Sequence, residues 1–246
     1  MIKKILLLCT ITLFLSACAH QKKAEVIYSE WHIQKRVLKE NNQRPLYEIS
    51  IDYPEVTNSL APHSTKDVNN VIQTFVKNSV QPFKEKMHLD NDDLKDFPPE
   101  MRKNYLHMTY TAAIVKPHLD TIISIRSRAE TLFLGQDIPK HYLAVLNYDM
   151  THGKILTLSS LFKPDSSYLE ILSDYCKEKL TKRLTSGMPW MAWNMTGLAP
   201  LPENFQYWNV QPNGLTITFD ESQLSPYSTT AQTVTIPYGV LKNVLA

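Results

Sequence analysis

Residues 68–87 of this chain read VNNVIQTFVKNSVQPFKEKM, and this segment carries the clearest periodicity in the sequence. Its apolar side chains recur at three- and four-residue steps, which places them on one face of an α-helix that packs on a core. Pro82 has no backbone N–H and its ring crowds the preceding turn, so it should kink the helix or end it near Gln81. The apolar positions are Val68, Val71, Ile72, Phe75, Val76, Val80, Phe83 and Met87.

Runs of alternating apolar and polar residues lie on both sides of this helix and predict strands. A second helix should begin near Asp165 or Ser166, either of which can cap its free amide groups, and end at Gly187. Its apolar positions are Leu169, Leu172, Tyr175, Cys176, Leu180 and Leu184. The predicted strands are 26–38, 46–53, 105–115, 121–134, 142–148, 155–158, 205–210, 215–219 and 233–236, and a short helix should start at Tyr238.

The order of these elements, βαββ twice, predicts the fold class. We expect an α+β protein of mainly antiparallel sheets packed with two longer helices, in two βαββ-like subdomains, because a doubly wound sheet would alternate strands and helices throughout. The chain has 246 residues, of which 43% are hydrophobic, so it can supply the core for one large domain or two small ones. The expected subdomains are 26–135 and 136–246.

The N-terminus has the pattern of an export signal. Lys3 and Lys4 precede an apolar run, Ile5–Phe14, that is too short to span a bilayer but suits a signal peptide. Leu15-Ser16-Ala17-Cys18 resembles the lipobox of bacterial lipoproteins, in which the cysteine is acylated after cleavage before it. We therefore expect a signal peptide at 1–17, lipidation of Cys18 and a lipidated tether over 18–25, with an ordinary secretory signal as the alternative.

The lipobox also carries an expectation about location. Ala19 stands where an aspartate would retain a lipoprotein in the inner membrane of enterobacteria-like species. By that resemblance we expect an outer-membrane lipoprotein that faces the periplasm, with a Gram-positive plasma membrane as the alternative. After loss of Cys9 and acylation of Cys18, Cys176 is the remaining thiol, so an intramolecular disulfide is not expected.

Composition and motifs argue against several function classes. The formal charge is +2, from 26 basic and 24 acidic residues, so nucleic acid is not an expected partner. Ser160-x-x-Lys163 fits a catalytic motif, but Pro164 and the missing partner motifs favour a turn. Asp90–Asp96 fails as a calcium loop, because its glycine and closing glutamate positions are Lys95 and Met101. Asp149 and His152 are too few for a metal site, so no metal and no cofactor is expected.

One segment without charges is rich in large side chains. Residues 186–202 carry two tryptophans and three methionines, and aromatic residues follow shortly after. Tryptophan and methionine are enriched where proteins bind partners, and sugar rings stack on indoles. Packing of this segment on the sheet is the alternative interpretation. The candidate ligand-binding residues are Trp190, Met191, Trp193, Tyr207, Trp208 and Tyr227.

Several segments resemble one extracytoplasmic family. Residues 147–162, NYDMTHGKILTLSSLF, resemble a stretch of the RsiV-like domain (DUF3298). Tyr53-Pro54 with the following helix looks like the smaller domain (DUF4163) that precedes it in PdaC-type deacetylases. The C-terminal signature of the RsiV-like domain is matched by Asn204-Phe205, Gly214–Asp220, Ser225–Tyr227 and Val234–Tyr238.

This resemblance implies an extracytoplasmic binding module. In RsiV-type anti-sigma factors the domain binds lysozyme, and in PdaC-type enzymes it accompanies a separate catalytic domain. The chain shows no sigma-binding segment and no deacetylase domain, so we expect a non-enzymatic, lipid-anchored envelope protein that binds lysozyme or peptidoglycan. The alternatives are a periplasmic hydrolase whose site is assembled from residues scattered in sequence, and a structural or assembly lipoprotein of an envelope complex.

Overall fold

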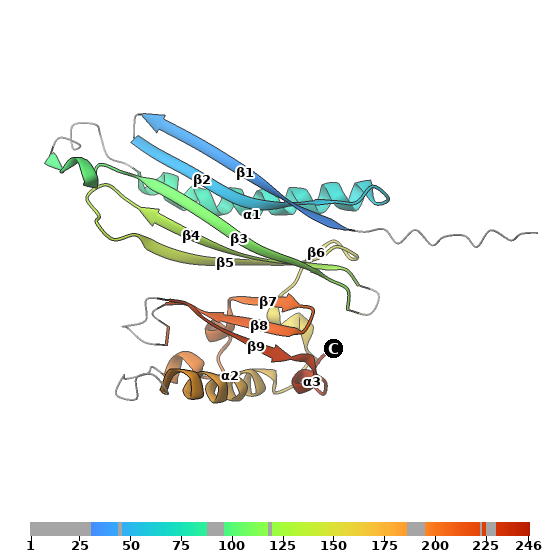
Figure 1. Cartoon of the computed structure of the whole chain (residues 1–246). Coiled ribbons are helices and arrows are strands. Elements are labelled where there is room, and N and C mark those ends of the chain that lie inside the picture. Colours follow the sequence, from blue (N-terminus) through green and yellow to red (C-terminus); the bar gives the residue numbers. More distant parts are fainter. Residues whose placement is uncertain are drawn as a thin grey trace, which may run out of the picture.

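The computed structural model describes residues 31–43, 46–87, 96–117, 120–185, 195–221, 223–224 and 230–246, without the side chains of Glu100, Leu184, Thr185 and Met195. Two sheets lie between two longer helices, α1 and α2 (Figure 1). One sheet has six strands and mixed direction, and the other has three antiparallel strands. The α+β class expected from the sequence is therefore confirmed.

The six-stranded sheet has its strands in sequence order, β1 to β6. All neighbours are antiparallel except β2 and β3, which run parallel because the α1 crossover joins them. The strands are β1 (His32–Gln43), β2 (Leu46–Thr57), β3 (Tyr105–Val115), β4 (Ile122–Leu132), β5 (Lys140–Asp149) and β6 (Lys154–Ile155), and the 3-10 helix η2 (Pro99–Met101) precedes β3.

Helix α1 (Pro62–Lys86) covers one face of this sheet. The buried positions Val68, Ile72, Val76 and Phe83 belong to the predicted apolar face, which confirms the helix. Of the two outcomes expected at Pro82, a kink or an end near Gln81, the second is wrong, because the helix continues through Pro82 to Lys86. Phe83, in the turn that follows the proline, is 3% exposed and packs with Ile49, Ile51 and Leu106, and this core contact favours the longer helix.

The C-terminal sheet lies against the opposite face of the six-stranded sheet. It consists of β7 (Trp208–Gln211), β8 (Gly214–Phe219) and β9 (Gln232–Pro237), and α2 (Tyr168–Thr185) packs on its outer face. Leu172, Cys176 and Leu180 of the predicted helix face are buried there. The remaining elements are the short helix α3 (Tyr238–Leu241) and the 3-10 helices η3 (Leu158–Leu161), η4 (Met195–Leu198) and η5 (Pro202–Phe205).

Helix α2 begins later than the sequence predicts. Asp165 has a positive φ of 57° and so cannot continue into a right-handed helix, and the first helical bond runs from Ile171 N–H to the Ser167 carbonyl. The predicted end at Gly187 lies outside the described residues.

The predicted boundary between residues 135 and 136 does not coincide with a boundary between sheets. Strands β4 and β5 are paired from Ile122–Asp149 to Thr131–Lys140, so the first sheet extends past residue 136. Residues 136–246 therefore supply β5 and β6 to the first sheet as well as the α2-β7-β8-β9 unit. Val115 and Ile122 of the first sheet share a core cluster with Leu215 of the second, which packs the two sheets together.

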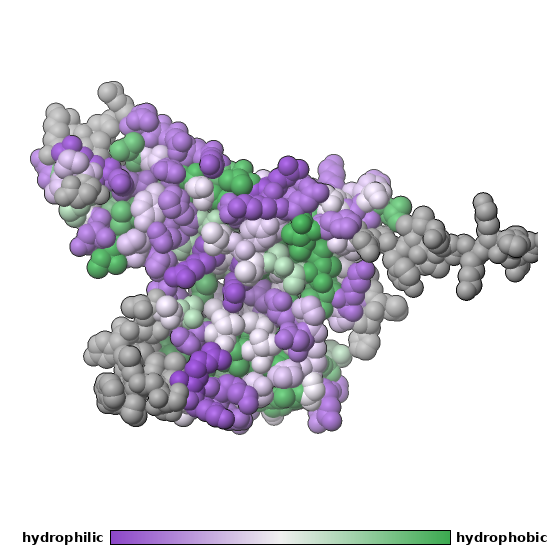
Figure 2. All heavy atoms as spheres, in the orientation of Figure 1, coloured by the Kyte–Doolittle hydropathy of each residue, from purple (hydrophilic) through white to green (hydrophobic). Residues whose placement is uncertain are grey.

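The surface view agrees with a protein whose apolar residues are mostly internal. Hydrophilic side chains cover most of the face in Figure 2, with separate apolar patches between them. Within the described ranges, we find no helix with the length and apolarity that a membrane span requires.

Candidate functional site

The structure describes two of the candidate ligand-binding residues. Trp208 is 5% exposed, its ring belongs to the core of the C-terminal half, and its carbonyl accepts a hydrogen bond from Asn147 Nδ2 at 2.9 Å. Packing is therefore the role of this ring in the structure. Tyr207 is half-buried, and burial raises the pKa of its phenol. Cys18, Trp190, Met191, Trp193 and Tyr227 lie outside the described residues.

The segments that hold the undescribed candidates start and finish at one end of the C-terminal sheet. Arg183 near the end of α2 donates from Nη1 to the carbonyl of Thr233 at the start of β9, at 3.0 Å. Tyr207 lies at the same end, because its carbonyl accepts from the N–H of Thr218 near the end of β8. In Figure 1 this is the end where α2 and β8 finish and β9 begins.

The described residues at this end form what we call the platform: residues 195–206 together with 220–221 and 223–224. Gln223 Nε2 donates to the carbonyls of Gly197 and Asn204, both at 2.9 Å. Asn204 Nδ2 in turn donates to the carbonyls of Thr196 and Ala199. The bonds from Gln223 connect the two parts of the platform, and those from Asn204 hold residues 195–206 together.

Gly197 allows the two parts of the platform to approach closely. A Cβ atom at this position would lie 2.4 Å from the carbonyl oxygen of Gln223, so only glycine fits without displacement of the backbone. The adjacent Leu198 carbonyl accepts from Ser173 Oγ of α2 at 2.6 Å, in a buried bond. The platform is therefore attached to the helix as well as to itself.

A group of charged side chains attaches the platform to the six-stranded sheet. His141 on β5 lies between two carboxylates, with Nε2 3.2 Å from Glu130 of β4 and Nδ1 3.2 Å from Glu221 of the platform. Arg128 of β4 also reaches Glu221, at 2.9 Å. Residues far apart in sequence meet here because β4 and β5 are paired and the C-terminal sheet lies on their face. The sequence alone contains no local pattern that indicates this group.

Tyr105 completes the group and affects its electrostatics. Its hydroxyl donates to Glu130 at 2.8 Å. That hydrogen bond, with further contributions from His141, lowers the pKa of the Glu130 carboxyl despite partial burial. Burial and the same hydrogen bond raise the pKa of Tyr105 to about 12, so the phenol stays a donor at ordinary pH.

A second polar group lies on the turn after β5. Asp120, Asp149 and His152 place one ligand atom each within 4.8 Å of one another, so Asp120 joins the pair noticed in the sequence. Burial raises the pKa of Asp149, but hydrogen bonds from the N–H of His152, its ring and the N–H of Thr151 together outweigh burial and lower it. The Asp149 carboxylate therefore already accepts three hydrogen bonds, and its role in the structure is to close this turn.

Ser160, Lys163 and Cys176, the side chains that could act as nucleophile or base, have structural roles instead. Ser160 Oγ donates to the Thr157 carbonyl, and Lys163 Nζ donates to the Asn243 carbonyl, so the Ser-x-x-Lys segment forms the predicted turn. Burial raises the pKa of the Cys176 thiol to about 12, which keeps it protonated and unreactive. The ring hydrogen bonds of His141 and His152 go to carboxylates.

One family matches part of the C-terminal half, and the relatives match most of the chain. Residues 159–239 match the family described as "Protein of unknown function (DUF3298)". The anti-sigma-V factor RsiV of Bacillus subtilis (strain 168) is 26% identical over 195 residues, which are 77% of this chain and 64% of that protein. The chain thus spans less than two thirds of this relative's length. It contains an RsiV-like domain of the DUF3298 family.

Two solved structures share the fold. A DUF3298 family member from Bacteroides fragilis superimposes with a TM-score of 0.60 at 15% identity, over 89% of this chain and 94% of that chain. A DUF3298 family protein from Pseudomonas aeruginosa PAO1 gives a TM-score of 0.52 at 13% identity, over 89% and 95%. The similarity covers both sheets, so the two halves described here occur together in other proteins.

Proposed function

We propose that this chain is a lipid-anchored, non-enzymatic binding protein of the cell envelope whose C-terminal domain recognises lysozyme. The observation that carries the proposal is the platform. The described residues that flank 186–194 and 225–229 in sequence include a base that Gln223, Asn204 and Ser173 fix by hydrogen bonds to backbone oxygens. Binding residues commonly lie on loops that a rigid scaffold positions.

The composition of these connections supports recognition of a partner. They contain Trp190, Met191, Trp193 and Tyr227, and large aromatic side chains contribute most to protein interfaces. Lysozyme is the first candidate because the domain resembles that of RsiV-type proteins. Peptidoglycan is the second candidate, because sugar rings stack on indoles.

The proposed location follows from the N-terminal sequence. Two acyl chains on the Cys18 thiol, with a third on the new amine, bind a membrane stably, whereas one chain alone gives marginal binding. With Ala19 after the cysteine, we propose the periplasmic face of an outer membrane. The platform lies at one end of the C-terminal sheet (Figure 1), and the described part of the chain begins at Trp31, just before β1.

The test is direct binding of residues 24–246, which include every described residue, to immobilised lysozyme and to purified peptidoglycan sacculi. We expect saturable retention of lysozyme that Trp190→Ala and Trp193→Ala weaken by about tenfold or more, as for truncation of aromatic hot spots. Trp31→Ala, the same change at the start of β1, should leave retention unchanged. Saturable retention of sacculi alone would replace lysozyme by a glycan ligand, and retention of neither would reject the proposal.

The other two functions give different results. A serine hydrolase would be labelled by a fluorophosphonate probe, whereas a binding protein would stay unlabelled. An assembly lipoprotein would be recovered, after crosslinking in cells, with a constant set of envelope proteins in the absence of lysozyme.

A further inference from the structure

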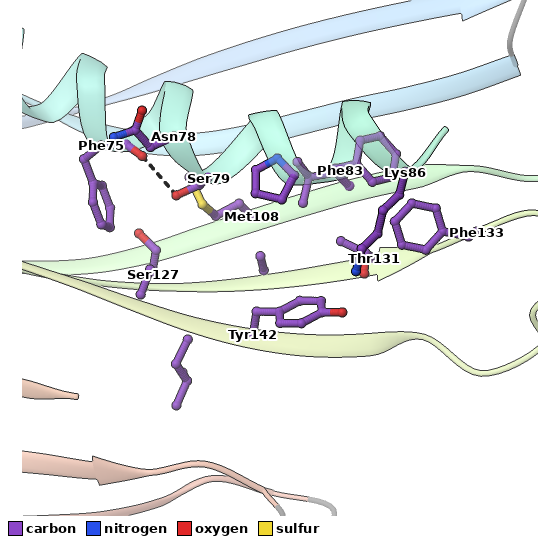
Figure 3. Close-up of a pocket in the computed structure, with 15 residues that line it drawn as sticks. Phe75, Asn78, Ser79, Phe83, Lys86, Met108, Ser127, Thr131, Phe133 and Tyr142 are labelled. Carbon is purple, nitrogen blue, oxygen red and sulfur yellow. Dashed lines mark hydrogen bonds between the residues drawn. The ribbon is translucent and has the colours of Figure 1, made fainter. Parts of the chain in front are cut away.

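An apolar groove runs alongside α1 on the six-stranded sheet, on the side away from the C-terminal sheet and its platform. Its volume is about 360 Å³, at the lower end of the range for small-molecule sites. Residues of α1, β3, β4 and β5 line it (Figure 3). It is a feature of the N-terminal half and is independent of the lysozyme proposal.

The groove exists because its floor is made of small side chains. Ser127, Ala129 and Thr131 alternate along β4 and face α1, and Ala144 of β5 lies beside them. Larger side chains at these positions would fill the space between the sheet and the helix, as they do around Ile123 and Ile125 further along β4. Small residues at successive inward positions therefore leave an apolar space open.

Two polar atoms along the groove lack the partners that buried atoms normally have. Thr131 is 5% exposed, and its Oγ1 has no hydrogen-bond partner among the described residues. The Gln136 Oε1 atom is likewise buried without a described partner, and it lines an adjoining hollow of about 290 Å³. That hollow shares Lys86, Phe133 and Tyr142 with the groove. The Thr131 hydroxyl can donate to an added acceptor, whereas the Gln136 oxygen only accepts and needs a donor such as water.

The end of the groove near Phe133 is basic. Lys86 Nζ lies 5.9 Å above the Phe133 ring, and in Figure 3 the Lys86 side chain extends from α1 toward Thr131 and Phe133. Lys140 lines the adjoining hollow. The described residues that line the groove and the hollow include no acidic side chain. A ligand with an apolar body and an anionic end would match both parts.

We propose that this groove binds a single-chain amphiphile with a carboxylate head, of the fatty-acid class. The chain would lie over Ala129 and Ala144 against Phe75 and Phe83. The carboxylate would accept hydrogen bonds from Lys86 Nζ and Thr131 Oγ1, which gives the orphan hydroxyl a partner. Charge-assisted hydrogen bonds of this kind are stronger than neutral ones.

The size of the groove selects a free amphiphile over a bilayer lipid. At ~30 Å³ for each water-sized group, the space accommodates a chain of roughly a dozen carbons. A phospholipid with two longer chains does not fit this volume.

Calorimetric titration of residues 24–246 with dodecanoate below its micelle concentration tests the proposal. We expect one dodecanoate to bind per protein molecule. Dodecyltrimethylammonium has the same alkyl group but a positive head, and it should bind at least about tenfold more weakly. Lys86→Gln should weaken dodecanoate by about tenfold, since one charged contact is lost. Lys77→Gln, on the exposed side of the same helix, should not weaken it.

A variant that fills the groove supplies the second criterion. Ala144→Phe should abolish dodecanoate binding while unfolding remains cooperative. If that variant does not fold, the dodecanoate affinities of Lys86→Gln and Lys77→Gln decide whether the proposal holds. The proposal fails if dodecanoate does not saturate, if both amphiphiles bind equally, or if wild type and Ala144→Phe bind it with the same affinity. Binding to phosphatidylglycerol vesicles without binding to free dodecanoate would also overturn it.

Discussion

Asn147 of β5 donates a hydrogen bond from Nδ2 to the main-chain carbonyl of Trp208, at 2.9 Å, and so connects the six-stranded sheet to the first strand of the C-terminal sheet. The Asn147 side chain also accepts from Ser124 Oγ at 2.6 Å, and that oxygen accepts from Asn209 Nδ2 at 2.9 Å. All of these groups are buried. A buried polar network thus connects one sheet to the other, and of its amide atoms Asn209 Oδ1 has no partner among the described residues.

Replacement of Asn147 should destabilise the protein markedly. Asn147→Ala leaves the Trp208 carbonyl and the Ser124 hydroxyl without their partners in a buried place, which costs about 2–3 kcal/mol of the free energy of unfolding. Urea denaturation followed by tryptophan fluorescence measures this. Asn70→Ala, on an exposed position of α1, should cost nothing, and equal losses for the two variants would contradict the role assigned to the network.

Gly197→Ala should disturb the platform. The added Cβ would lie 2.4 Å from the Gln223 carbonyl oxygen, so one part of the platform must move and the hydrogen bonds of Gln223 must weaken. We expect a loss of about 1–3 kcal/mol in stability together with weaker retention on lysozyme. Gly239→Ala is the control, because a Cβ there has no neighbour within 4 Å. Unchanged retention for Gly197→Ala would mean that the platform does not position the binding residues.

Most of the secondary structure could be predicted from the sequence, because it depends on the local periodicity of apolar residues. The strand expected at 105–115 is β3, and the buried face of α1 is the one that the apolar spacing indicates. The errors have long-range causes. The helix continues through Pro82 because Phe83 packs in the core, and the first sheet extends past residue 136 because β5 pairs back onto β4.

The candidate sites were harder to predict from the sequence, because the pairing of strands brings their residues together. His141 meets Glu130 and Glu221 across two sheets, and Thr131 faces Lys86 from a strand far along the chain. Charge patterns or motifs in a single sequence do not encode these distances. Trp208 illustrates the converse case, since an aromatic residue chosen for its type lies in the core. The residues that lie outside the described ranges, such as Trp190, keep their place as predictions.

Stability should fall with acid partly through Glu130. Its pKa is lowered in the folded protein, first by the hydrogen bond from Tyr105, so the unfolded chain takes up its proton at a higher pH than the folded one. The stabilisation is present above the ordinary glutamate pKa and is lost as pH falls through the lowered value. Urea unfolding between about pH 3 and pH 6 should therefore show weaker acid dependence in Glu130→Gln than in wild type.

A matched variant separates this effect from general acid destabilisation. Glu203 is exposed in η5, and Glu203→Gln removes a carboxylate that is outside the His141 group. Its acid dependence should equal that of wild type. If Glu130→Gln has the same profile as Glu203→Gln, the hydrogen bond from Tyr105 does not contribute to stability in solution.

The Cys176 thiol should react only when the protein unfolds. Burial raises its pKa to about 12, so the reactive thiolate is scarce at ordinary pH, and the side chain is fully enclosed among Leu172, Leu180 and their neighbours. In residues 24–246 it is the single cysteine, which makes the assay simple. Reaction with a disulfide reagent should be slow in buffer and immediate in denaturant. Fast labelling of the native protein would show that the α2 face opens readily.

Cys18→Ser should release the protein from membranes. With the acylated thiol removed, the chain loses the anchor that two or more acyl chains provide, and fractionation followed by immunoblotting should move it from the membrane pellet to the soluble fraction. Cys176→Ser is the matched control, since it alters a buried thiol and should leave the protein in the pellet. Retention of Cys18→Ser in the pellet would show that the first seventeen residues, or a bound partner, hold the chain at the membrane and that the lipobox resemblance is coincidental.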